Sequence, residues 1–210
     1  MLAPNATQKA ALLTDRDGIL VELVYNVGTA SFEAPLHAKD VQLRSGALDI
    51  IRVVRQAGWP LVVVSNQPAY AKGECTREQL DAVHMQVENE LQKSGAAIDR
   101  YYYCHHHPTA VVPALAGPCA CRKPAPGLLL QAGDELGLDL TASWMLGDRD
   151  SDMEAGRRAG CHTLLVPDPR SGRDGGEPDM RVADLFEAAE FLRTVLIPLA
   201  SSPTDHAKRH

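Results

Sequence analysis

The chain lacks several features that would assign it to a membrane or secreted class of protein. None of its apolar stretches is long enough to cross a lipid bilayer. The first ten residues do not contain the hydrophobic core of a signal peptide. Its five cysteines, an odd number, do not fit the disulfide framework of a small secreted domain. From these absences we expect a cytoplasmic protein that does not bind membranes.

An excess of positive charge is also missing. The chain of 210 residues has 21 Lys and Arg against 27 Asp and Glu, a net charge of −6, and its pI is near 5.7. This balance argues against a general binder of nucleic acids or anionic membranes. It does not exclude a small phosphate ester, because a few local cations can bind one. There is no internal repeat, and we expect one domain over residues 1–200, a frayed polar tail at 201–210 and a monomer.

Short apolar runs alternate with segments of helical periodicity. A run such as Leu61-Val62-Val63-Val64 is typical of a strand buried on both faces of a parallel sheet. The pattern predicts a Rossmann-like, doubly wound, mostly parallel α/β sheet with helices on both faces. The expected strands are 12–14, 61–64, 98–103, 143–146 and 163–166, and the expected helices are 47–57, 76–91, 127–136, one through 156–159, and 183–196. Loops are expected at 21–43, 104–126 and 167–179.

Four polar clusters follow predicted strands or begin a predicted helix. Each cluster alone has about even odds of being an ordinary turn or helix cap. In a parallel sheet, however, the carboxyl ends of the strands share one edge, and ligands bind there. The four clusters can therefore converge on one site although they are far apart in sequence: Asp15/Asp17, Ser65/Asn66, Arg122/Lys123 and Asp148/Asp152.

Phosphoryl transfer is the chemistry that suits these side chains. A carboxylate at Asp15 would attack phosphorus, and Asp17 would protonate the leaving oxygen and later activate water. Ser65 and Lys123 would hold the phosphoryl oxygens, where charge spreads in the transition state. A carboxylate nucleophile and a phosphate repel each other, so we expect Mg²⁺ between them, with Asp148 completing its site.

A second metal site is predicted in the irregular segment. Cys104-x-His106 and Cys119-x-Cys121 offer three thiolates and one imidazole, the closed set of a structural zinc site. The alternative is a loop with free thiols. Alternation along an extended segment favours His106 over its two histidine neighbours. Cys75 and Cys161 have no companion ligands and are expected to pack or to be bare surface thiols.

The ordered clusters resemble the four motifs of the haloacid dehalogenase superfamily. The resemblance covers about Leu12 to Val166, and the residues that carry it are Asp15-Arg16-Asp17-Gly18, Ser65-Asn66-Gln67, Arg122-Lys123-Pro124 and Gly147-Asp148. The zinc loop, residues 104–121, is similar to that of the heptose-1,7-bisphosphate 7-phosphatases and of the related histidinol-phosphate phosphatases. No inserted segment is long enough for a separate cap domain.

The resemblance implies a Mg²⁺-dependent phosphatase with a structural zinc. It would remove the 7-phosphate of D-glycero-D-manno-heptose 1,7-bisphosphate through a phosphoaspartate, in the synthesis of nucleotide-activated heptose for lipopolysaccharide or capsule. The implied roles are catalysis by Asp15 and Asp17; Mg²⁺ binding by Asp15, the Asp17 carbonyl and Asp148; and substrate binding by Ser65, Asn66, Arg122 and Lys123. Asp152 would orient Lys123 or a metal-bound water.

Two other functions stay open at this point. The same chemistry on histidinol phosphate is the nearer alternative, although Arg122 beside Lys123 favours a substrate with two phosphates. A non-catalytic, zinc-stabilised binding protein on the same fold is the other, and the presence of all the catalytic residue types together speaks against it. His37, in the segment 21–43, is a weak candidate for a substrate contact.

Overall fold

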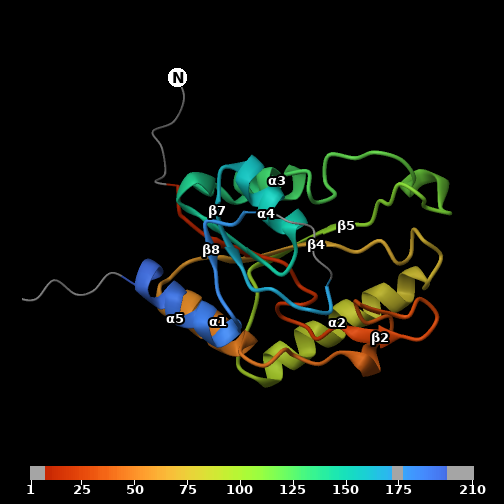
Figure 1. Cartoon of the computed structure of the whole chain (residues 1–210), viewed down its shortest axis with the longest axis horizontal. Coiled ribbons are helices and arrows are strands. Elements are labelled where there is room, and N and C mark those ends of the chain that lie inside the picture. The colour runs from red at the N-terminus through yellow and green to blue at the C-terminus, as the bar shows by residue number, and fades with distance from the viewer. Residues whose placement is uncertain (1–7, 172–176, 198–210) are drawn as a thin grey trace, which may run out of the picture.

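The computed structural model describes residues 8–171 and 177–197 (Figure 1). Its centre is a sheet of six strands in the order β5-β4-β1-β6-β7-β8, and every neighbouring pair is parallel. The strands are β1 (Leu12–Thr14), β4 (Leu61–Asn66), β5 (Arg100–Cys104), β6 (Trp144–Gly147), β7 (His162–Leu165) and β8 (Met180–Arg181).

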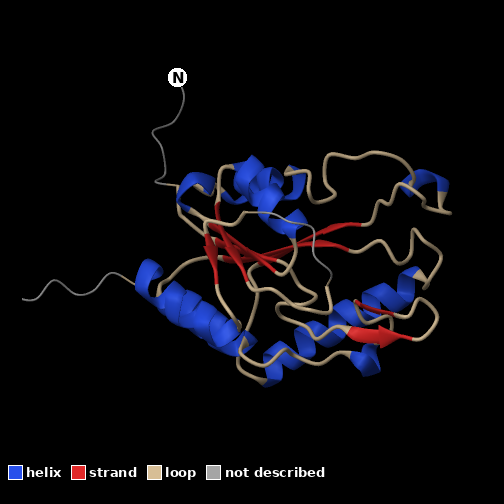
Figure 2. Cartoon of the chain, in the orientation of Figure 1, coloured by secondary structure: helices blue, strands red, loops and turns tan. Residues whose placement is uncertain are grey.

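Helices cover both faces of the sheet, as Figure 2 shows. One face carries α1 (Ala47–Gln56), α2 (Arg77–Lys93) and α5 (Leu185–Leu196), and the other carries α3 (Gly127–Leu136) and α4 (Asp150–Ala159). The doubly wound fold predicted from the alternation is confirmed. Among the described residues, no helix combines the length and the apolar character needed to cross a membrane.

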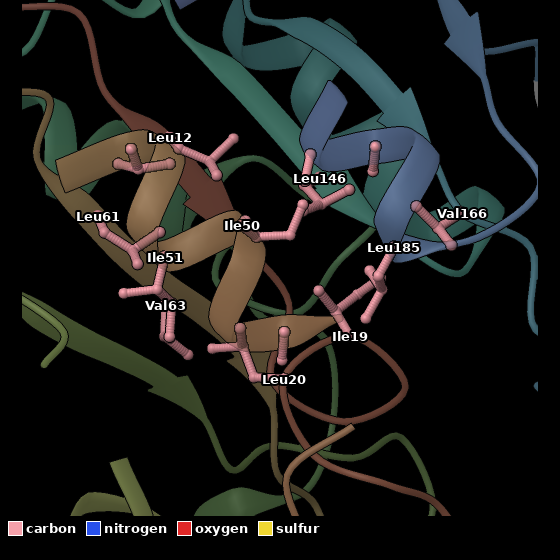
Figure 3. Close-up of a cluster of buried hydrophobic side chains, with 14 of the residues drawn as sticks. Leu12, Ile19, Leu20, Ile50, Ile51, Leu61, Val63, Leu146, Val166 and Leu185 are labelled. Atoms are coloured by element: carbon pink, nitrogen blue, oxygen red, sulfur yellow. The ribbon is translucent and has the colours of Figure 1, made fainter. Parts of the chain in front are cut away.

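Alternate strand residues supply the two halves of the core. Leu12 packs with the cluster under α1 and α5, while the next residue, Leu13, packs with the cluster under α3 and α4. This is the alternation expected of a strand with both faces buried. In Figure 3, Ile50 and Ile51 of α1 and Leu185 of α5 lie with strand residues such as Leu146.

Local sequence signals account for the helix boundaries. The capping box predicted for α2 is present: the Gln79 backbone donates to Thr76 Oγ1 at 3.2 Å, and the Thr76 backbone donates to Gln79 Oε1 at 2.8 Å. Gly58, with φ of +69°, follows the end of α1. Observed strand limits differ from the expected ones by at most two residues.

Several short elements were not expected. An antiparallel hairpin, β2 (Val24–Asn26) with β3 (Ser31–Glu33), lies in the segment predicted as irregular. Its residues are exposed or half-buried, so the sequence there contains no apolar run that would predict a strand. The two-residue β8 is too short to give a pattern. Short 3₁₀ turns occur at Ala38–Asp40, Pro113–Leu115 and Leu140–Ala142. The predicted tail, 201–210, lies outside the described residues.

Candidate active site at the carboxyl edge of the sheet

Asp15 follows β1, the strand that lies between β4 and β6 in the sheet. Its backbone N–H donates to the Leu146 carbonyl at 3.0 Å, which extends the parallel pairing by one residue. One carboxylate oxygen accepts from the Arg16 backbone N–H at 2.7 Å, and the other lies 3.0 Å from Lys123 Nζ. The carboxylate is thus fixed at the end of the strand with a cation beside it.

Lys123 is buried, and its ammonium group connects three elements of the site. Nζ donates to the Val64 carbonyl at 2.7 Å and lies 3.0 Å from Asp15 and 2.6 Å from Asp152. Burial alone would lower the pKa of Lys123, but the two carboxylates outweigh it, so the pKa is raised and the ammonium stays charged.

Asp15, Asp148 and Asp152 form an acidic cluster, with one oxygen of each within 4.8 Å of the others. Burial, followed by repulsion from Asp152 and Asp15, raises the pKa of Asp148 to about 7. Burial also raises the pKa of Asp152 to about 6, against the opposing effect of Lys123. Three buried carboxylates and one ammonium leave an excess of negative charge at the cluster.

A magnesium ion fits this donor set. Asp148 Oδ1 is buried and has no hydrogen-bond partner, which is costly unless a cation approaches it. Carboxylate oxygens are the ligands that Mg²⁺ prefers. Gly18 lies directly against Asp148, where a β-carbon would collide with the carboxylate, and its φ of +84° also favours glycine.

Asp17 lies only two residues from Asp15 but has entirely different neighbours. Its carboxylate accepts from Arg16 Nε at 3.0 Å and lies 3.0 Å from Arg16 Nη2, which makes a two-pronged ion pair. Gln67 Nε2 adds a third donor at 2.5 Å. Burial alone would lower the pKa of Arg16, but Asp17 raises it above its ordinary value. The Asp17 side chain does not belong to the acidic cluster, so only its main-chain carbonyl is left as the Mg²⁺ ligand that we expected.

Ser65 and Asn66, at the end of β4, lie beside these groups. Buried Ser65 accepts a hydrogen bond from Gln67 Nε2 at 3.0 Å. The Asn66 side chain makes two hydrogen bonds with the main chain of Lys123, donating to its carbonyl at 3.0 Å and accepting from its N–H at 3.1 Å. A substrate contact of Asn66 stays a prediction; in this structure its amide holds Lys123.

The predicted zinc ligands come together in a separate group beyond β5. Cys104, His106, Cys119 and Cys121 each offer an atom within 4.8 Å of the other three. Their sulfur–sulfur distances are 3.0, 3.4 and 3.7 Å, and His106 Nδ1 lies 3.4 and 3.8 Å from two of the sulfurs. Ligands of a tetrahedral Zn²⁺ with bonds of about 2.3 Å lie about 3.8 Å apart. A zinc ion fits this group, and the distances exclude disulfides.

Two residues beside the predicted zinc ligands, Arg122 and His105, donate to main-chain carbonyls. Arg122 is half-buried and donates from Nη1 to the His106 carbonyl at 3.2 Å, so the zinc loop supports the side chain expected to bind substrate. His105 is not in the ligand group; its Nδ1 donates to the Gln67 carbonyl at 3.0 Å. His37 contacts Gln79 Nε2 at 3.3 Å, next to the start of α2, and no described contact places it in the site.

Three residues of the site have no role in the sequence prediction. They are Arg16 and Gln67, which surround Asp17, and Ser171, whose hydroxyl donates to Asp148 Oδ2. Arg16 and Gln67 belong to motifs that were recognised in the sequence, so their positions could be noticed from sequence. Their contacts with Asp17 could not. Ser171 lies in the loop after β7, where nothing in the sequence distinguished it.

Comparison with known proteins identifies the family. A family model for hydrolases of the haloacid dehalogenase type matches residues 120–188. D-glycero-beta-D-manno-heptose-1,7-bisphosphate 7-phosphatase of Yersinia pestis is 37% identical over 157 residues, which are 74% of this chain and 79% of that protein. The chain belongs to the haloacid dehalogenase superfamily. Within it, this chain is a member of the heptose-bisphosphate phosphatase family and a phosphoric monoester hydrolase.

Other haloacid dehalogenase relatives agree with this assignment. D-glycero-alpha-D-manno-heptose-1,7-bisphosphate 7-phosphatase of Photorhabdus laumondii is 32% identical and covers 81% of this chain and 87% of that protein. The solved structure of a D,D-heptose 1,7-bisphosphate phosphatase from B. bronchiseptica, complexed with magnesium and phosphate, superposes with a TM-score of 0.71 at 28% identity. It covers 88% of this chain and 98% of that one. The predicted superfamily is confirmed.

Proposed function

We propose that this phosphatase hydrolyses the 7-phosphate of a D-glycero-D-manno-heptose 1,7-bisphosphate by way of a phosphoaspartate on Asp15. One observation carries the reaction type: the buried Asp15 carboxylate lies against the Lys123 ammonium and within 4.8 Å of carboxylate oxygens of Asp148 and Asp152 at the carboxyl edge of the sheet. The names of relatives that are 37% and 32% identical over most of their length support the identity of the sugar.

The first half-reaction transfers the phosphoryl group to the protein. An Asp15 oxygen forms a bond to phosphorus while the bond from phosphorus to the sugar oxygen breaks. The Lys123 ammonium beside Asp15, and the hydroxyl of Ser65, stabilise the charge on the phosphoryl oxygens. Asp17 supplies the proton that the sugar oxygen needs to leave as an alcohol.

The second half-reaction frees the enzyme. Asp17 accepts a proton from a water molecule, the water oxygen bonds to phosphorus, and the bond to Asp15 breaks to release phosphate. Mg²⁺, when held by Asp15, Asp148 and the Asp17 carbonyl, reduces the repulsion between the carboxylates and the phosphate. Asp152 keeps Lys123 in place, since the two form an ion pair of 2.6 Å with both side chains almost completely buried.

The zinc loop supports the proposal that the substrate carries a second phosphate. Cys121, Arg122 and Lys123 are consecutive, so binding of Zn²⁺ by the loop would fix two cations at once. Arg122 then carries the positive charge that suits a second, unreacting phosphate. We propose both beta and alpha anomers as candidate substrates, because relatives with either name are similar to this chain.

A substrate panel tests this function. Purified protein with Mg²⁺ would be assayed for phosphate release from both heptose bisphosphate anomers, fructose 1,6-bisphosphate and histidinol phosphate. We expect the highest kcat/KM with one heptose bisphosphate anomer. A higher kcat/KM with histidinol phosphate would show that histidinol phosphate is the preferred substrate, while the proposed reaction would be unchanged. No turnover of any of the four would leave only the non-catalytic binding protein.

A further inference from the structure

We propose that Gln67, together with Arg16, is the positioning pair that sets the acid/base carboxylate of Asp17 relative to the phosphoryl-binding hydroxyl of Ser65. The proposal rests on the phosphoaspartate reaction above, in which Asp17 acts in both halves. Neither residue would touch the substrate or the reacting atoms; each would act through Asp17.

The hydrogen bonds of the Gln67 side chain join the two functional groups directly. Its Nε2 donates to Asp17 Oδ2 at 2.5 Å and to Ser65 Oγ at 3.0 Å, and its Oε1 accepts from Arg16 Nη2 at 2.8 Å. All of its side-chain polar atoms are thus engaged within the site, and only 3% of the residue is exposed. One amide fixes the distance between the acid/base and the hydroxyl that holds the phosphoryl group.

Arg16 completes the arrangement from the opposite side. Its Nε and Nη2 reach the two oxygens of Asp17, and its guanidinium lies over the ring of Tyr103, with 5.5 Å between Cζ and the ring centroid. With 1% exposure, Arg16 is among the most deeply buried large side chains of the chain. A buried ion pair gives little net stability compared with a packed apolar pair, so stability alone is a weak reason for this arginine.

Gln67 directly follows β4, and its main chain is anchored at the end of β5. Its N–H donates to the Cys104 carbonyl at 2.7 Å, and its carbonyl accepts from His105 Nδ1 at 3.0 Å. Both partners lie at the start of the zinc loop. The position of the Gln67 amide, and through it that of Asp17, therefore depends on how this loop is held.

The test uses an aryl ester, so that it does not depend on the identity of the sugar. Nitrophenolate leaves without a proton, so the first half-reaction of p-nitrophenyl phosphate does not need Asp17, whereas hydrolysis of the phosphoaspartate does. In Gln67→Met, which keeps the volume and removes the amide, the first-turnover release of nitrophenolate should stay within about threefold of the unmodified protein. Its steady-state rate should fall about tenfold or more, with accumulation of phosphoenzyme.

Gln86→Met is the matched control, because it makes the same chemical change on α2, where the Gln86 amide donates to Glu90 Oε1. It should leave both rates unchanged. A merely structural role for Gln67 would lower the burst and the steady state by the same factor without accumulation of phosphoenzyme, and that result would overturn the proposal. Unchanged burst and steady-state rates in Gln67→Met would also overturn the proposal. If Gln67→Met does not fold, Arg16→Lys must give the same split; an equal loss of both rates there would refute it.

Discussion

Asp15 and Asp17 stand two residues apart, yet they occupy electrostatically opposite surroundings. Asp15 shares its region with two more buried carboxylates and a single ammonium, so that region carries excess negative charge. Asp17 is paired with one guanidinium and an amide, so its negative charge is balanced by side chains alone. The region of the proposed nucleophile would be completed by Mg²⁺, whereas the region of the proposed acid/base is complete as the chain folds.

The largest effect expected from this comparison is on the nucleophile. Asp15→Asn removes the attacking oxygen, and we expect kcat to fall by roughly 10⁴-fold or more with no labelled phosphoenzyme. Asp17→Asn should slow both half-reactions but still form a phosphoenzyme from an aryl ester. Rapid quench with labelled substrate distinguishes the two. A phosphoenzyme trapped in Asp15→Asn would assign the nucleophile to another residue.

Disruption of the zinc loop should affect both regions at once, because Lys123 follows Cys121 and Gln67 is anchored on Cys104 and His105. In Cys119→Ser we expect loss of bound zinc, a lower Tm, and a fall of kcat/KM by about 10²-fold, the usual result of small displacements at a site. Metal analysis and melting curves check it beside the kinetics. Cys75→Ser, outside the ligand group, is the control. Full kcat/KM in a zinc-free sample that still holds Mg²⁺ would contradict the prediction.

Ser171→Ala sharpens the comparison within the nucleophile's region. The Ser171 hydroxyl donates to Asp148 Oδ2, and such outer hydrogen bonds orient a ligand carboxylate. We expect Mg²⁺ affinity to fall about tenfold while kcat at saturating Mg²⁺ changes little. Titration of activity against Mg²⁺ measures both. An equal effect in Ser31→Ala, on the hairpin, would show that the change is not specific to Asp148.

The smallest effect expected is on stability. In metal-free protein, burial and repulsion raise the pKa of Asp148 to about 7, whereas an unfolded aspartate titrates near about 3.9. Between these values the native state binds more protons, so its stability falls as the pH rises from about 5 to about 7. We expect the Tm with chelator to be a few degrees lower at the upper pH, and Mg²⁺ to raise it more there. Asp148→Asn should reduce this dependence to the part that comes from Asp152, whose pKa is raised to about 6. An equal gain from Mg²⁺ at both pH values would place the metal away from Asp148.

Much of this site followed from sequence because parallel strands impose a common edge. Asp15 and Asp148 each follow a buried apolar run, and the pairing of Thr14 with both Val63 and Leu146 brings those runs into line. The group of predicted zinc ligands could also be found from sequence, since the spacing of thiolates and imidazole reflects a local geometry. In each case a short pattern specified the arrangement without knowledge of distant contacts.

The surroundings of Asp17 did not follow in the same way. An aspartate two residues after a predicted nucleophile suggests a role, but its rotamer depends on Gln67, which follows β4, and on Arg16, whose guanidinium lies over Tyr103 of β5. Ser171 reaches Asp148 from a loop without periodicity. The hairpin from Val24 to Glu33 is also set by contacts that no local pattern records, including the guanidinium of Arg170 over Phe32. Side-chain networks of this kind are properties of the assembled fold.

The place of β1 in the sheet also determines when the enzyme can become active during synthesis. The strand is made before β4 and β6, yet Leu12 pairs with Leu61 on one side and with Trp144 on the other. Lys123, Asp148 and Asp152 reach Asp15 only after the ribosome has passed them. Nascent chains that end before β6 thus lack part of the active site, and activity should appear late in translation.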